Sequence, residues 1–204
     1  MDTKIIRVGS QEGQEQLAFL DKNLVQPNKI ELLFRASEHN FRAQEFHNKC
    51  DGIKDTLVVV RTACGSTFAG YSHYKWNDVK NGSYVKDPSR KAFLLQLNRK
   101  EKMVPQQDGS LIGCHKDWGP VFGEGDLYLS DKCNTNSNSG AFLPKTYNKH
   151  YKRFKCSQES WNAFSGATSG YHFRVEEYEV YSLDWAEGSG LYSTLIFYIA
   201  QALT

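Results

Sequence analysis

The sequence predicts a mainly β protein, an antiparallel β-sandwich with helices at its edges. Two observations support this fold class. Runs of β-branched and aromatic residues recur along the chain after residue 55, whereas helical periodicity is confined to the part before it. A regular alternation of strand and helix signals, which a parallel α/β sheet requires, is not found in the 204 residues. This length suits a single domain.

The first expected helix lies within the polar first thirty residues. Leu17, Phe19, Leu20 and Leu24 recur at spacings suited to one helical face. Pro27 is expected to end this helix, because proline cannot continue the backbone hydrogen-bond pattern. Residues 32–34 are then expected to form a short buried strand.

A second, shorter helix is expected to follow. Asn40 is the expected N-cap, since its side chain can accept a hydrogen bond from the first turn. Gly52 is expected to stop the helix. Residues at intervals of three and four share its predicted buried face. They are Ala43, Phe46, His47 and Cys50.

Several further strands are expected after this helix. Residues 56–61 are mostly β-branched and apolar, which is typical of a strand buried on both faces. Gly65 forms part of a turn that leads into a returning partner strand. Residues 76–90 are polar and carry turn-forming dipeptides, so they are expected to form a loop. The strands are expected at residues 56–61, 67–73, 92–97 and 110–114.

A glycine-rich segment, residues 118–129, is the most informative part of the chain. Gly119, Gly123 and Gly125 indicate backbone at positive φ or backbone packed too closely for a Cβ atom. A phosphate-binding loop would lead into a helix, whereas an alternating apolar strand follows here. We therefore interpret the segment as architectural.

The last third of the chain begins with a long polar connection. Residues 131–168 hold few strand signals, and a loop of this length is usually functional or mobile. Residues 171–183 are expected to return as a strand, with a bulge at Glu176 and Glu177 where the apolar positions change parity. Glu177 and Glu179 are expected on a solvated face, because neighbouring strand positions leave no sugar-sized cleft between two catalytic carboxylates.

The glycine-rich segment resembles the signature of the TLDc domain family. The residues that carry the resemblance are Gly119, Pro120, Phe122, Gly123, Gly125 and Asp126. Four other blocks agree in order, namely residues 33–37, 46–51, 68–71 and 175–181. The resemblance implies two packed sheets with edge helices, no catalytic residues, and association with oxidative-stress resistance and the vacuolar proton-pumping ATPase. The expected organisation is a short N-terminal extension with a helix (1–30), a TLDc-like domain (15–185) and an apolar appendage (186–204).

Composition argues against several broad classes of protein, namely nucleic-acid-binding, membrane-spanning, secreted and disulfide-rich proteins. The formal net charge of +2 is too small to indicate nucleic acid or a membrane surface as the partner. No stretch has the roughly 20 apolar residues of a membrane-spanning helix, and no secretory signal is recognised. The five cysteines are odd in number and form no Cys-x-x-Cys pair, which favours reduced thiols. The expected location is cytoplasmic, with a cytoskeletal or ciliary place as the more specific alternative.

Neither a catalytic centre nor a metal site is predicted. Cys114 and His115 are adjacent on an expected strand, so their side chains point to opposite faces and cannot act as nucleophile and base together. The six histidines are scattered without zinc-site spacing. The run from Asp131 to Asn138 offers oxygen ligands, but Ser139 and Lys145 stand where an EF-hand needs glycine and glutamate. We expect no cofactor.

A basic and aromatic run within the long connection is the first candidate partner-binding site. Its cations alternate with tyrosine and phenylalanine, a pattern that suits an acidic protein surface. The alternatives are nucleic acid and a plain solvated loop whose aromatic residues pack inward. The expected partner is a protein rather than nucleic acid. The candidate residues are Lys145, Lys149, Lys152, Arg153 and Lys155.

The C-terminal appendage is the second candidate. Residues 190–204 are uncharged and strongly apolar, yet too few to span a bilayer. Leu195, Ile196 and Ile199 are its candidate contact residues. The segment either packs on its own sandwich, docks on another subunit or associates with a membrane surface, and both helix and strand remain open for it.

Three functions follow from these observations. The first is a non-catalytic TLDc-like interaction module of the kind linked to oxidative-stress resistance and binding of the vacuolar ATPase. The second is a stoichiometric structural subunit of a large assembly, such as a ciliary or microtubule array. The third is a thiol-dependent antioxidant enzyme, which would need an exposed cysteine of low pKa.

Overall fold

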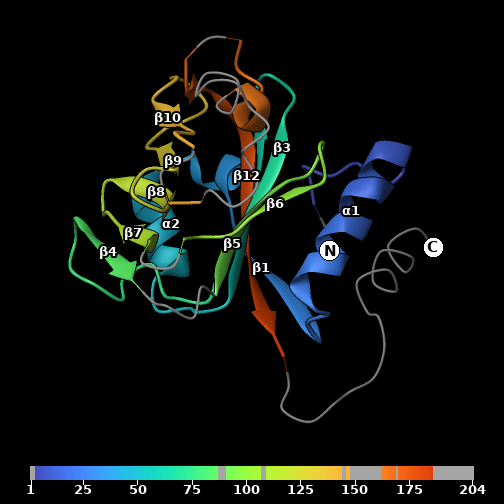
Figure 1. The fold of residues 1–204 in the computed structure, drawn as a ribbon. Helices are drawn as coiled ribbons and strands as arrows, with labels where there is room; N and C mark the ends of the chain where they lie inside the picture. The colour runs from blue at the N-terminus through green and yellow to red at the C-terminus, as the bar shows by residue number, and fades with distance from the viewer. Residues whose placement is uncertain are drawn as a thin grey trace.

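A computed structural model describes residues 3–86, 91–106, 109–143, 146–147, 162–168 and 170–185. These residues form two six-stranded sheets in which every paired strand is antiparallel (Figure 1). The predicted fold class, an antiparallel β-sandwich with few helices, is confirmed.

The strands of each sheet come from distant parts of the chain. The first sheet has the order β1 (Lys29–Arg35), β12 (Val175–Asp184), β2 (Thr56–Thr62), β3 (Thr67–Ser72), β5 (Ala92–Gln96), β6 (Glu101–Met103). The second sheet has the order β11 (His172–Phe173), β10 (Ser139–Gly140), β9 (Leu127–Ser130), β8 (Trp118–Phe122), β7 (Ser110–Cys114), β4 (Ser83–Lys86).

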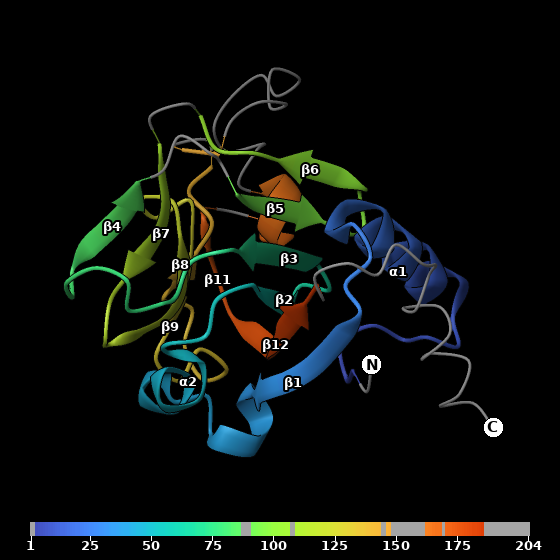
Figure 2. The ribbon, with the colours of Figure 1, turned by 90° about the horizontal axis from the view of Figure 1, so that it is seen from below.

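The outer face of the first sheet is covered by α1 (Gln11–Leu24), which Figure 2 shows lying beside that sheet and away from the second one. Ser10 caps this helix, because its Oγ accepts a hydrogen bond from the Gly13 amide at 3.0 Å. The apolar face buries Leu17, Leu20 and Leu24 as predicted, whereas Phe19 is only partly buried. Within the described part of the chain, no helix combines the length and the apolar character needed to cross a membrane.

Strand β2 shows why its sequence lacks the usual alternation of polar and apolar residues. Val58 and Val60 belong to the core between the sheets, whereas Leu57 and Val59 belong to the cluster beneath α1. All four side chains are buried. The prediction of a strand buried on both faces is therefore confirmed. The bulge predicted in β12 is also present, since its register against β2 shifts between Val175 and Glu177.

The expected N-cap of the second helix is wrong. Asn40 instead ends a short 3-10 helix, η1 (Ala36–His39), in a left-handed conformation with φ 52°. The second helix, α2 (Ala43–Cys50), begins after Arg42, which makes no side-chain cap. A distant side chain takes that role, because Asp131 Oδ1 accepts a hydrogen bond from the Ala43 amide at 2.8 Å.

Three other expectations need correction. Residues 76–90 are not wholly a loop, because they contain β4, which is short and paired on one side only. The glycine-rich segment holds a strand before its turn as well as the expected one after it, since its first half forms β8. Residues 32–34 do form a strand, but Leu32 is 38% exposed because β1 lies at the edge of its sheet.

Candidate partner-binding site

All eight of the predicted contact residues lie outside the described part of the chain. They are Lys145, Lys149, Lys152, Arg153 and Lys155 of the basic run, and Leu195, Ile196 and Ile199 of the appendage. Their role stays a prediction. The structure does describe the residues on both sides of segment 148–161, which holds most of the basic run, and these two stems show how the sandwich positions that segment.

The N-terminal stem is held by a buried carboxylate of the glycine-rich signature. Asp126 is fully buried, and its two oxygens accept hydrogen bonds from the Thr146 amide at 2.7 and 2.9 Å. Its Oδ1 also accepts one from the Tyr147 amide at 3.1 Å. Hydrogen bonds to a carboxylate are about twice as strong as neutral ones, so this contact fixes the backbone of the stem.

The next side chain secures the same stem. Tyr147 is fully buried between the sheets, and its hydroxyl donates to the Leu111 carbonyl oxygen at 2.7 Å. Burial, followed by the nearby Asp126 charge, raises the pKa of this phenol well above its ordinary value. The hydroxyl therefore remains protonated and remains a hydrogen-bond donor.

Glycine at position 123 makes the Asp126 arrangement geometrically feasible. Gly123 has φ 62°, and a Cβ atom there would overlap the Asp126 carboxylate. Its amide donates to the Leu111 carbonyl at 3.0 Å, which ties the turn to β7. The architectural role predicted for this segment is therefore specific: the turn directs the Asp126 carboxylate onto the backbone of residues 146–147.

Another signature residue joins the two sheets. Phe122 is fully buried, and its ring lies over Gly70 of β3, where a Cβ atom would overlap it. The same ring meets Trp76 edge to face with a centroid distance of 5.4 Å. Gly70 belongs to the third of the four other sequence blocks, residues 68–71, so motifs far apart in the chain meet across the core.

The C-terminal stem, residues 162–168, is anchored at the other side of the sandwich. Phe164 is fully buried against Phe68, with ring centroids 4.7 Å apart. The Phe164 carbonyl accepts hydrogen bonds from Ser66 Oγ at 2.6 Å and from Gln96 Nε2 at 3.2 Å. These contacts bind the stem to the turn between β2 and β3, beside an open depression of about 670 Å³. Both ends of segment 148–161 are therefore fixed by buried contacts.

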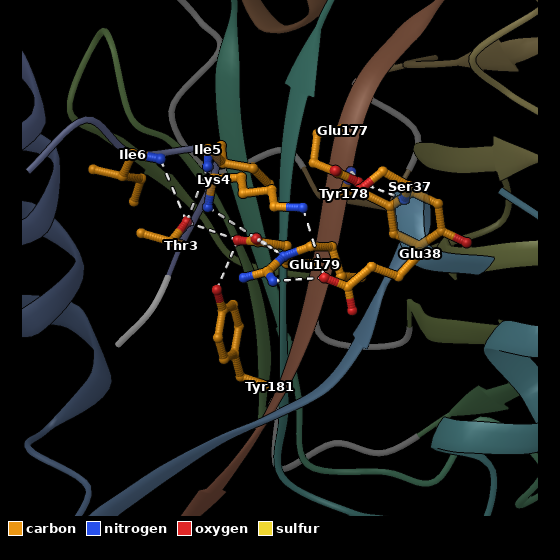
Figure 3. A network of polar contacts seen from close by, with 11 residues as sticks. Thr3, Lys4, Ile5, Ile6, Ser37, Glu38, Glu177, Tyr178, Glu179 and Tyr181 are labelled. Carbon is orange, nitrogen blue, oxygen red and sulfur yellow. Dashed lines mark hydrogen bonds and ion pairs between the residues drawn. The ribbon is translucent and has the colours of Figure 1, made fainter. Parts of the chain in front are cut away.

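A second buried carboxylate holds the N-terminal residues. Figure 3 shows Thr3, Lys4 and Tyr181 converging on Glu179. Glu179 Oε1 accepts from the Lys4 amide at 3.0 Å and from Arg35 Nε at 2.7 Å. Its Oε2 accepts from Thr3 Oγ and from the Tyr181 hydroxyl, each at 2.7 Å. Four donors thus occupy a side chain that is 0% exposed.

The expected solvated face is therefore wrong for Glu177 and Glu179. Residues 3–6 cover Glu179, and Glu177 is buried beside η1, where its Oε1 accepts from the Ser37 and Tyr178 amides at 3.0 Å each. No local sequence signal shows this, because the partners of Glu179 include residues more than 140 positions away. The neighbouring Glu176 is exposed as expected.

The guanidinium of Arg35 links this network to the surface. Burial lowers the pKa of Arg35, but its contacts with Glu38 at 2.9 Å and Glu179 at 2.7 Å outweigh that effect and raise it. The arginine is therefore always charged and always a donor. Because both oxygens of Glu179 accept two hydrogen bonds each, this carboxylate clamps the N-terminal segment and has no free position for acid–base chemistry.

Comparison with protein-family models gives one match that spans most of the chain. The model of the TLDc domain matches residues 6–184. The chain belongs to the TLDc domain family. A search of curated proteins found no match to the sequence. In this TLDc domain, the matched region includes the glycine-rich turn, both stems and both carboxylate anchors.

Two histidine–carboxylate pairs lie in the TLDc domain, and neither forms a catalytic arrangement within the described residues. His73 Nδ1 lies 2.6 Å from Asp55 Oδ1, which also accepts from the Tyr71 hydroxyl at 2.6 Å. No serine, threonine or cysteine in the described residues hydrogen-bonds to His73, so that part of the chain supplies no nucleophile. His47 pairs with Asp51 at 2.8 Å, and its Nε2 lies about 3 Å from two backbone carbonyls, which makes it a tie between α2 and the turn before β8.

A peroxide-consuming enzyme needs an exposed thiol of low pKa, and the described buried cysteines of the TLDc domain do not provide one. Burial raises the pKa of Cys50 far above the ordinary thiol value, and it raises that of Cys133 to about 12. Burial also raises the pKa of Cys114. None of these three has the low pKa that peroxide chemistry needs. Cys64 is exposed. The described residues contain no cluster of histidine, cysteine and carboxylate side chains that could hold a metal ion.

Proposed function

We propose that this TLDc domain is a non-catalytic protein–protein interaction module that binds the vacuolar proton-pumping ATPase and contributes in that way to oxidative-stress resistance. The observation that carries the proposal is the double anchoring of segment 148–161. Asp126 and Tyr147 fix one end, and Phe164 fixes the other. Buried polar contacts of the sandwich hold both stems of a segment that carries a dense basic and aromatic sequence.

The chemistry of the segment suggests an acidic protein surface as its partner. Lys149, Lys152, Arg153 and Lys155 bring four cations within seven positions, separated by Tyr151 and Phe154. Cations at a protein interface mainly raise the rate of association, whereas aromatic side chains supply the buried contact area. Because both ends of the segment are anchored, less conformational entropy is lost on binding than for a free chain. A partner with two assembly states is then shifted toward the state that the domain binds better.

The test compares two variants of equal charge in the full chain. Both carry four substitutions to glutamate, and the control places them at exposed lysines of the described residues. The test variant changes Lys149, Lys152, Arg153 and Lys155. The control variant changes Lys22, Lys75, Lys80 and Lys116. Each protein is immobilised at low salt in an extract of its own cells, and the recovered proteins are identified and quantified by mass spectrometry.

The expected result is recovery of ATPase subunits with the native protein and the control, and a loss of roughly tenfold or more with the test variant. The recovery should also depend on nucleotide, since nucleotide changes the assembly state of the pump. Equal recovery with both variants would contradict the role of the segment.

A different set of recovered proteins would favour the structural alternative. A ciliary or microtubule subunit should co-purify with cytoskeletal proteins at fixed stoichiometry and without any response to nucleotide. Tubulin carries an acidic surface, so the same charge reversal should also weaken that association. The identity of the recovered proteins and their nucleotide response therefore separate the two functions, even though both would use the same segment.

A further inference from the structure

Strand β1 offers an open edge. Within the described residues it is the outermost strand of its sheet and pairs with β12 on one side only. Figure 2 shows it along the margin of the sandwich, with no other described strand beyond it. An edge strand presents a row of backbone N–H and C=O groups that can pair with another strand. On this strand, Leu32 is 38% exposed, although it is a large apolar residue.

The chain leaves the described sandwich beside this edge. Asp184, the last residue of β12, lies opposite Lys29, the first residue of β1. Trp185 follows, and its Nε1 donates to the Val25 carbonyl oxygen at 3.1 Å. Val25 is 79% exposed and has φ 52°, a left-handed conformation that β-branched residues rarely adopt. The residues after 185 therefore start next to an apolar surface and an open strand edge.

The sequence of these following residues suits a strand. Residues 191–199 read Leu-Tyr-Ser-Thr-Leu-Ile-Phe-Tyr-Ile, with no charge and mostly β-branched or aromatic side chains. Residues 186–190 contain two glycines and a serine, which suit a turn. An uncharged run of this kind is an aggregation hazard when it is left unpaired.

We propose that residues 191–199 pair with the outer edge of β1 as an added strand of the first sheet. The chain leaves β12 at the Lys29 end, so the added strand runs parallel to β1. It must cross two strand spacings, about 10 Å, and the five residues 186–190 reach up to about 17 Å. Nine residues extend for roughly 30 Å, enough to cover the seven residues of β1.

The short linker, residues 186–190, favours the chain's own segment over a second copy as the strand that pairs with β1. A segment joined by a short linker has an effective concentration in the millimolar range at the neighbouring edge, far above the concentration of a second copy. The strand covers Leu32 and the open backbone groups of β1, and it removes the edge at which another chain could add. Both the exposed leucine and the apolar tail are explained by one contact.

The experiment is hydrogen exchange on the full chain, read at peptides covering β1. Leu195→Pro removes a backbone donor from the middle of the added strand and breaks its pairing. Ser189→Pro is the matched control in the linker. We expect slow exchange in β1 for the native protein and for Ser189→Pro. In Leu195→Pro the outward amides of β1 should exchange about tenfold faster or more, which corresponds to roughly 1.4 kcal/mol of lost protection. The amides of β2 should not change, which shows that the sandwich remains folded.

Two outcomes would overturn the proposal. One is fast exchange at the outward β1 amides in the native protein, or equal exchange in the two proline variants. The other is protection that weakens on dilution together with a dimer in light scattering, because the occupant of the edge would then be a second copy of the chain.

Discussion

The Glu179 clamp leads to the sharpest test of the structure. Glu179→Gln keeps the shape of the side chain but removes its charge and replaces one oxygen by an amide. Glu176→Gln, three positions earlier on the same strand, is the matched control. Glu179 is 0% exposed and faces the buried Arg35, whereas the Glu176 side chain is 56% exposed and pairs with Arg61 at 3.0 Å. The two variants thus make one chemical change in two environments.

The expected losses of unfolding free energy differ because Glu179 is buried and Glu176 is exposed. Removing one partner of a buried ion pair costs about 3–5 kcal/mol, because the other charge is left poorly compensated. The contact of Arg35 with the half-exposed Glu38 retains part of that compensation, so we expect about 3 kcal/mol for Glu179→Gln. Breaking an exposed pair costs about 0.5 kcal/mol. A loss of 3 kcal/mol is a large fraction of the roughly 5–15 kcal/mol that stabilises a domain.

Urea unfolding of the two variants provides the assay. With a slope of roughly 2 kcal/mol per molar urea, the unfolding midpoint falls by about 1.5 M for Glu179→Gln and by about 0.25 M for Glu176→Gln. Amide exchange at Lys4 should accelerate in the first variant, because this amide donates to Glu179. Similar midpoints for both variants would refute the assignment of Glu179 as a clamp. Loss of a biochemical activity without loss of stability would refute it as well.

Three further predictions concern the signature turn and the thiols. Gly123→Ala should destabilise the protein by about 2 kcal/mol or more in urea unfolding, because the added methyl meets the Asp126 carboxylate at positive φ, whereas Gly52→Ala, with open space around it, should cost about 1 kcal/mol. A thiol reagent at pH 8 should label Cys64 in the folded protein and reach the buried Cys133 only after denaturation. Burial raises the pKa of Cys133 from the ordinary 9.0 to about 12. The contribution of the buried thiol to stability is therefore complete below pH 9 and is lost as the pH rises from 9 through 12. In urea unfolding at several pH values, Cys133→Ala should lose less unfolding free energy than the native protein between pH 9 and 12.

The parts of the fold that were predictable depend on short-range patterns. The apolar run of β2 indicated burial on both faces, and the parity change near Glu176 indicated a bulge, because both signals lie within a few residues. Strand β4 was missed because a short strand, paired on one side only, carries few apolar positions. Asn40 was a reasonable cap by residue type, but the amide of Ala43 is capped by Asp131 from 88 positions away. Such a partner is fixed by the packed sandwich and leaves no local mark.

For the candidate site, too, the sequence indicated which residues matter but not which distant groups they contact. Asp126 could be selected from the sequence as part of the glycine-rich signature, since the glycines around it mark a constrained backbone. Its task could not be predicted, because the amides that it accepts belong to residues 146 and 147. For Glu179, the alternation of β12 predicted one face for it and for Glu177, but not that the N-terminal residues would cover its side chain.

The two buried carboxylates share one physical role. Asp126 and Glu179 each accept backbone amides from a segment that is not part of either sheet, the first from the stem at 146–147 and the second from residue Lys4. A carboxylate offers about four acceptor positions, so a single side chain can replace the ladder of bonds that a strand would supply. Carboxylates in a glycine-rich turn or on a central strand invite an acid–base interpretation. Here full burial and saturation with donors leave neither group an open position for a substrate proton, and the chemistry of both is used to hold the irregular segments against the sandwich.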